Sequence, residues 1–153
     1  MQDLKLESLH IKPIKHPNTL RTKNMFDIVV RNSRLVNSED KANSNYIYVG
    51  RPTALGNPFS HLGYVKNITL VPTPKVAVKE YENWIRAQID LGNQHVLYAL
   101  SQIYDQAMKD RIYLMCWCKD ELLPRHGDHE CHAEVIRKII IEEHEIQMRE
   151  SNG

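Results

Sequence analysis

Short apolar runs and longer amphipathic stretches alternate along this chain, and their periods predict strands and helices. The β-branched run at 26–31 and the apolar run at 46–49 have the length and composition of strands. A third such run, at 111–116, leads directly into a cysteine-rich segment. Residues 32–44 and 53–72 show neither period and are rich in turn-forming residues, so we expect a polar connector and a long loop there.

Apolar residues recur at helical spacing in three stretches. Thr73 followed by Pro74 is typical of a helix start, because threonine caps free N–H groups and proline fits the first helical position. This helix should end at Gly92, and a second helix should start near Asn93. The last predicted helix covers about 132–148.

Strands separated by helices favour a small single-domain α/β fold, with a partly parallel sheet of three to five strands flanked by helices in a Rossmann-like manner. Residues 25–150 should form this domain, and residues 1–24 an arm that is extended or only partly ordered. Two loops, after residues 49 and 115, both follow predicted strands. Ligands collect at the carboxyl ends of parallel strands, so we expect these loops to meet in one pocket.

Composition narrows the class of protein. The chain has 153 residues, of which 42% are hydrophobic and 25% charged, as in one soluble globular domain. The net charge of +1 and the lack of a basic stripe argue against a nucleic-acid partner. No apolar stretch is long enough for a membrane span or a secretory signal, so we expect a cytoplasmic protein, in the host cytoplasm if it is viral.

The loop after the second strand carries the first candidate binding residues. Gly50 and Gly56 permit close backbone approach, and Pro52 stiffens the path between them. Arg51 offers a planar fork for a phosphate or carboxylate, and Asn57 can either read a base edge or fix the loop internally. The alternative is a structural turn in which Arg51 pairs with an acidic residue. The spacing matches neither a phosphate-binding P-loop nor a dinucleotide fingerprint.

All three cysteines lie between residues 116 and 131, a clustering that indicates metal binding or thiol chemistry rather than a disulfide scaffold. Cys116, Cys118, Cys131 and His132 are the predicted ligands of a zinc ion, because thiolate and imidazole are its preferred donors. The intervening residues 119–130 contain His126 and His129 as further candidate ligands.

Two other interpretations of this cluster stay open. In the first interpretation, the cysteines are buried and act only as small hydrophobic residues. In the other, Cys131 at a helix N-terminus is a reactive thiolate, with His132 or His129 assisting. If zinc is bound and catalytic, Glu134 or Asp128 would carry the proton. The sequence His-Ala-Glu at 132–134 matches the H-x-E of zinc deaminases, but the cysteines precede it and a deaminase is not favoured. Trp117 either shields the cluster or stacks on a planar ligand.

These segments together resemble a domain-of-unknown-function family of bacteriophages and bacteria. The resemblance covers about residues 26–141 and rests on the signature GRP-x-x-LGNPF … CWC … CHA(D/E), at 50–59, 116–118 and 131–134. It implies an accessory role in a virus or mobile element. The family usually has a shorter link between its second and third motifs, and often aspartate where this chain has Glu134.

The predicted function is the binding or processing of a nucleotide, nucleobase or related metabolite. The 50–57 loop would hold the ligand, and the Cys/His cluster would hold zinc or supply a thiol. Hydrolase and transferase activity on nucleotides both fit, and so does binding without catalysis. The alternative is a non-enzymatic, zinc-stapled module that binds a host protein or sequesters a small ligand.

Overall fold

The main sheet is parallel and has the strand from the cysteine-rich part of the chain at its centre. A computed structural model describes residues 26–117 and 131–152. Strand β5 (Ile112–Cys116) lies between β1 (Ile28–Asn32) and β2 (Tyr46–Tyr48), and pairs with both in parallel. The three carboxyl ends therefore meet at one edge of the sheet. The prediction of a small α/β fold with a parallel sheet is confirmed.

The three long helices begin where the sequence predicts. Helix α2 (Pro74–Asp90) is capped by Thr73, whose hydroxyl accepts a hydrogen bond from the Val76 amide at 3.1 Å. Helix α3 (Gln94–Lys109) is capped by Asn93, directly after the turn at Gly92. Helix α4 (His132–Asn152) extends a few residues beyond its predicted end.

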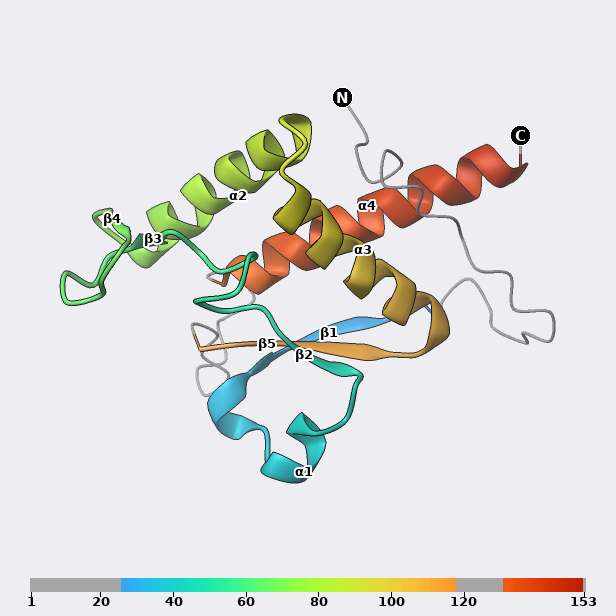
Figure 1. Cartoon of the computed structure of the whole chain (residues 1–153), viewed down its shortest axis with the longest axis horizontal. Helices are drawn as coiled ribbons and strands as arrows, with labels where there is room; N and C mark the ends of the chain where they lie inside the picture. The colour runs from blue at the N-terminus through green and yellow to red at the C-terminus, as the bar shows by residue number, and fades with distance from the viewer. Residues whose placement is uncertain (1–25, 118–130, 153) are drawn as a thin grey trace.

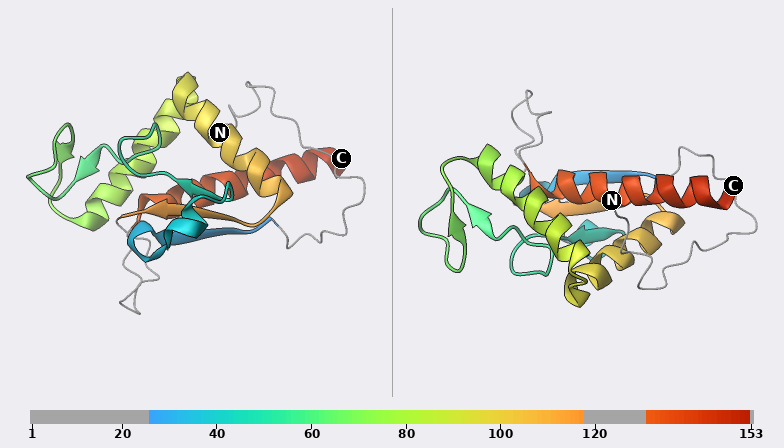
Figure 2. Two further views of the ribbon diagram at one scale, coloured as in Figure 1. Left: turned by 60° about the horizontal axis from the view of Figure 1, so that its bottom comes forward. Right: turned by 90° about the horizontal axis from the view of Figure 1, so that it is seen from above.

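The sheet is covered by long helices on one side and by a short helical segment on the other. Helices α2, α3 and α4 lie together above the sheet in Figure 1, and α1 (Ser38–Lys41) lies below it. Figure 2 shows α4 running alongside β1 and β5. The helix-facing strand residues are almost fully buried, and they form the core with the inner faces of the helices: Ile28, Ile112, Leu114, Tyr81, Ile85, Leu97, Leu100, Ile136 and Ile140.

Both segments predicted to be irregular contain short elements. The connector at 32–44 includes a 3-10 turn, η3 (Ser33–Leu35), and helix α1, whose asparagine caps explain why a polar stretch turns there. The long loop contains β3 (Phe59–Ser60) and β4 (Thr69–Leu70), which pair in parallel. Elements this short leave no detectable period in the sequence, and that is why the prediction missed them. The predicted arm at 1–24 lies outside the described residues.

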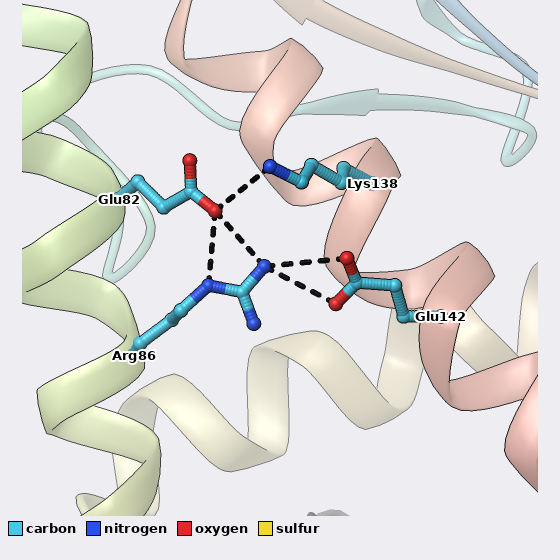
Figure 3. Close-up of polar contacts among 4 residues, drawn as sticks. All are labelled: Glu82, Arg86, Lys138 and Glu142. Carbon is cyan, nitrogen blue, oxygen red and sulfur yellow. Dashed lines mark hydrogen bonds and ion pairs between the residues drawn. The ribbon is translucent and has the colours of Figure 1, made fainter. Parts of the chain in front are cut away.

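An ion-pair network joins α2 to α4 on the surface. Arg86 on α2 contacts Glu82 one turn earlier at 2.9 Å and Glu142 on α4 at 3.1 Å. Lys138 on α4 reaches the same Glu82 carboxylate at 3.0 Å (Figure 3). Burial alone would raise the pKa of Glu82, but the hydrogen bonds from Lys138 and Arg86 outweigh it and lower that pKa.

We expect the Arg86→Met substitution to lower the free energy of unfolding by less than about 1 kcal/mol, because partly exposed ion pairs are screened by solvent. Arg34→Met, at an exposed arginine of η3, is the control. Glu82 has a folded-state pKa below its ordinary 4.5, so its contribution is present above that pH and is lost as the pH falls through the folded value. Urea titrations at neutral and acidic pH should therefore show the difference shrinking in acid. A loss of several kcal/mol would contradict this.

Candidate ligand-binding site

A cavity of about 570 Å³ opens at the carboxyl edge of the parallel sheet. Its walls come from four parts of the chain: the loop after β2, the segment around β3, the first turns of α2, and the residues that follow β5 and begin α4. The two loops that the sequence placed at strand ends thus meet in one cavity. Its volume lies within the range of small-molecule sites.

Hydrogen bonds from side-chain hydroxyl groups to the backbone shape the first wall, which is the loop after β2. The Tyr48 hydroxyl donates to the Arg51 carbonyl at 2.7 Å, and the Thr53 hydroxyl donates to the Gly50 carbonyl at 2.6 Å. A side chain at Gly50 would collide with the Tyr48 ring. A glycine at position 50 is therefore required for this tyrosine to fold back over the loop.

The Arg51 side chain is partly engaged in holding this loop. One of its terminal N–H groups donates to the Asn57 carbonyl at 2.6 Å. Within the described residues the guanidinium makes no ion pair with an acidic side chain, so the alternative of an Arg51–carboxylate turn finds no partner there. Arginine has five N–H donors, and most of those of Arg51 therefore remain available at the exposed mouth of the cavity.

Asn57 connects the loop to α2. Its side chain, only 8% exposed, accepts from the Phe59 amide at 2.8 Å and donates to the Ala77 carbonyl at 3.3 Å. Tyr81 of the same helix donates its hydroxyl to the Leu55 carbonyl at 2.7 Å. These contacts fix the loop internally, which is one of the two roles predicted for Asn57.

Two candidate residues reach the cavity from the cysteine-rich end of the sheet. His132, the first residue of α4, is 4% exposed, and its Nε2 lies 2.8 Å from the Val49 carbonyl oxygen. A carbonyl oxygen only accepts, so this nitrogen carries the proton. Trp117 follows β5 and is 54% exposed, with the Lys41 ammonium 5.6 Å from the centre of its ring. The tryptophan therefore presents an aromatic surface beside a positive charge.

The electrostatic character of the cavity favours an anion. No acidic side chain is among the described residues that line it, and Arg51 supplies a permanent positive charge. Pro74 and Ala77, from the first turn of α2, also contribute to the wall. The N-terminal ends of α2 and α4 both border the cavity, and the partial positive charge at each helix start adds to that of Arg51.

The two described cysteines are not among the residues that line the cavity. Cys116 at the end of β5 and Cys131 before α4 form no disulfide, are buried to 0% and 1% exposure, and have their sulfurs 2.6 Å apart. In the described part of the chain no three His, Cys, Asp or Glu residues are grouped closely enough to hold a metal ion. Cys118, His126, Asp128 and His129 lie outside that part. Zinc binding by Cys116, Cys118, Cys131 and His132 stays a prediction.

The structure thus divides the predicted site residues into two sets. Gly50, Arg51, Asn57, Trp117 and His132 line the cavity, whereas Pro52 and Gly56 shape the loop without being among the lining residues. Cys131 and Glu134, the other two predicted catalytic residues, are not among the lining residues either. A catalytic role for Cys131, His132 and Glu134 stays a prediction.

Several lining residues were missed from the sequence: Tyr48, residues 59–62, Pro74, Ala77 and Val78. The Thr73-Pro74 signal located the start of α2, but no local pattern indicates that this start faces the end of the sheet. The pairing of β3 with β4 brings residues 59–62 to the cavity, and pairing between two-residue strands is not readable from sequence.

Residues 29–142 match the family model described as domain of unknown function DUF4326. The chain belongs to this family. The resemblance to a domain-of-unknown-function family is thereby confirmed, while its signature and its association with bacteriophages stay predictions. The residues matched by the DUF4326 model include every residue that lines the cavity. No curated protein and no solved structure matches the chain. In the described residues, no helix is long and apolar enough to cross a membrane.

Proposed function

We propose that this protein binds a small anionic metabolite of the nucleotide class in the cavity at the carboxyl edge of its sheet. The observation that carries the proposal is the combination, in one cavity of about 570 Å³, of Arg51, an exposed Trp117 and no acidic side chain among the described lining residues. Arginine favours phosphate or carboxylate, and an exposed indole offers a face on which a planar base can stack.

The position of the cavity supports the same conclusion. In open parallel sheets, ligands bind outside the carboxyl ends of the strands, where loops of different strands converge. Here the loops after β2 and β5 converge with the start of α2. A phosphate near Arg51 would also meet the positive end of that helix.

Binding is better supported than catalysis. The Nε2 of His132 is engaged with the Val49 carbonyl, and the Cys131 sulfur lies against Cys116. Glu134 is not among the residues that line the cavity. A hydrolase or transferase needs a nucleophile or a proton carrier within hydrogen-bond reach of the ligand, and these contacts direct two of the candidate groups elsewhere. An accessory role in a virus or mobile element is compatible with ligand sequestration.

The test is a binding panel that separates the phosphate from the base. Nucleoside monophosphates, the matching nucleosides, free bases and inorganic phosphate should be titrated by calorimetry, with product analysis after incubation to detect turnover. We expect the monophosphates to bind more tightly than the nucleosides, without turnover. Failure of every member of the panel to bind would contradict the proposal.

The Arg51→Met substitution should weaken monophosphate binding by about 10- to 100-fold, the value of one or two hydrogen bonds to a charged group. Nucleoside binding should change little, because it does not use the arginine. Arg34→Met removes an equal charge from η3 and is the matched control. Equal affinity losses for monophosphate and nucleoside would indicate that Arg51 only holds the loop.

A further inference from the structure

Two nearly buried side chains in the cavity wall have hydrogen-bond donors that the described protein does not use. Ser60, in β3, is 6% exposed and Asn57 is 8% exposed, and both line the cavity. The Ser60 hydroxyl oxygen accepts from the Leu62 amide at 3.0 Å, and one N–H of the Asn57 side chain donates to the Ala77 carbonyl. Within the described residues, the hydroxyl proton of Ser60 and the second side-chain N–H of Asn57 find no acceptor.

The chemistry of these two groups indicates what they bind. Buried polar groups in native proteins are almost always hydrogen-bonded, and a buried donor without an acceptor is unfavourable. Both unused groups are donors, and no acidic side chain is among the described residues that line the cavity. The matching part of a ligand therefore accepts hydrogen bonds and can carry negative charge.

Positive charge lies on the same wall. The Arg51 guanidinium is held beside Asn57, because its Nη1 donates to the Asn57 carbonyl at 2.6 Å. Ser60 follows three residues later, so the Cα atoms of Asn57 and Ser60 are at most about 11 Å apart. Strand β3 also packs against α2 (Figure 1), whose first turn contributes Pro74 and Ala77 to the cavity. The positive end of α2 therefore lies close to all three donor side chains.

We propose that Asn57 and Ser60, together with Arg51, bind the phosphate group of the ligand through their unused N–H and O–H donors. This phosphate seat (Arg51, Asn57 and Ser60) rests on the proposed function, since it assigns the phosphate contacts of the same cavity. A phosphate monoester carries three strong acceptor oxygens, which suits donors from three side chains. Arg51 supplies the charge, and the other two residues supply neutral donors that are already shielded from solvent.

The Ser60→Ala variant removes one donor and leaves Arg51 and Asn57 in place. Inorganic phosphate, the tightest-binding nucleoside monophosphate and its nucleoside should be titrated by calorimetry into this variant and the wild type. We expect about 10-fold weaker binding of phosphate and of the monophosphate, which is the value of one hydrogen bond to a charged group. Nucleoside binding should stay unchanged, because the nucleoside has no phosphate.

Ser101→Ala is the matched control. Ser101 on α3 is 8% exposed, its hydroxyl donates to the Tyr98 carbonyl at 2.8 Å, and it is not among the residues that line the cavity. This variant should bind all three compounds as the wild type does. Ser60→Ala also loses the bond from the Leu62 amide. The nucleoside titration controls for that loss, because a distorted wall would weaken nucleoside and phosphate binding alike.

A second measurement uses the wild type alone and tests Asn57 without substitution, because its other polar atoms hold the loop. Saturating inorganic phosphate should shift the side-chain amide signals of Asn57 in NMR spectra of the isotope-labelled protein. The side-chain signals of Asn93, whose amide group donates to Gln88 beyond the far end of α2, should not move.

Three results would overturn the phosphate seat. They are unshifted Asn57 signals in saturating phosphate, equal phosphate affinities of Ser60→Ala and Ser101→Ala, and equal losses of phosphate and nucleoside affinity in Ser60→Ala. The seat and the proposed function can also fail separately. Monophosphates that bind more tightly than nucleosides, with Ser60→Ala behaving as the control, would reject only the seat. Phosphate binding that Ser60→Ala weakens, with no nucleotide binding more tightly than phosphate, would support the seat and reject the nucleotide class.

Discussion

The Gly56→Ala substitution should lower the free energy of unfolding by about 3 kcal/mol or more and abolish ligand binding. A Cβ atom at this position would stand 2.8 Å from the Cα and 2.9 Å from the backbone nitrogen of Arg51. These are backbone atoms, which cannot move aside by a side-chain rotation. The loop would have to open, and the Arg51–Asn57 and Tyr81–Leu55 hydrogen bonds depend on its present path.

Gly63→Ala is the matched control for this prediction. A Cβ atom there meets nothing within 4 Å, and its backbone needs no glycine-specific conformation. This variant should be neutral or slightly stabilised, since alanine restricts the unfolded chain more than glycine does. Urea unfolding of both variants measures the difference. Equal stabilities would mean that the loop adapts at little cost and that Gly56 is dispensable.

Sequence periodicity predicted the parts of the fold that depend on local signals. Thr73 and Asn93 locate helix starts because a capping side chain bonds to an amide only two or three residues away. The apolar runs located all three strands of the main sheet, because the composition of a strand is also a local signal. The order of those strands, with β5 between β1 and β2, depends on contacts between distant residues. The sequence contains no local signal for it.

The sequence predicted where in the fold the candidate site lies, but not all of the residues that form it. That strand-end loops converge follows from parallel pairing, and Arg51, Trp117 and His132 do line one cavity. The roles of Gly56 and Cys131 were harder to infer. Gly56 lies against the backbone of Arg51, five residues earlier, and the Cys131 sulfur lies against a sulfur fifteen residues earlier in the sequence. Both contacts arise only when the chain is packed in its fold, and the residue types alone do not predict them.

Asn57 provides the sharpest test of whether the loop residues are structural. In Asn57→Asp, one carboxylate oxygen keeps the bond from the Phe59 amide, but the other faces the Ala77 carbonyl oxygen. A nearly buried negative charge beside a carbonyl oxygen is unfavourable, and we expect a loss of about 2–3 kcal/mol at pH 7. Asn67→Asp, at an exposed position, should cost less than about 0.5 kcal/mol.

The pH dependence of this loss identifies its cause. Below about pH 4 the new carboxyl group is protonated in the folded and unfolded states, and its hydroxyl can donate to the Ala77 carbonyl. The deficit should therefore be small in acid and grow as the pH rises, because only the unfolded state ionises readily. Urea titrations between pH 4 and pH 7 measure it. If Asn57 instead reads the edge of a ligand, Asn57→Asp will keep the wild-type urea midpoint at both pH values and lose only ligand affinity.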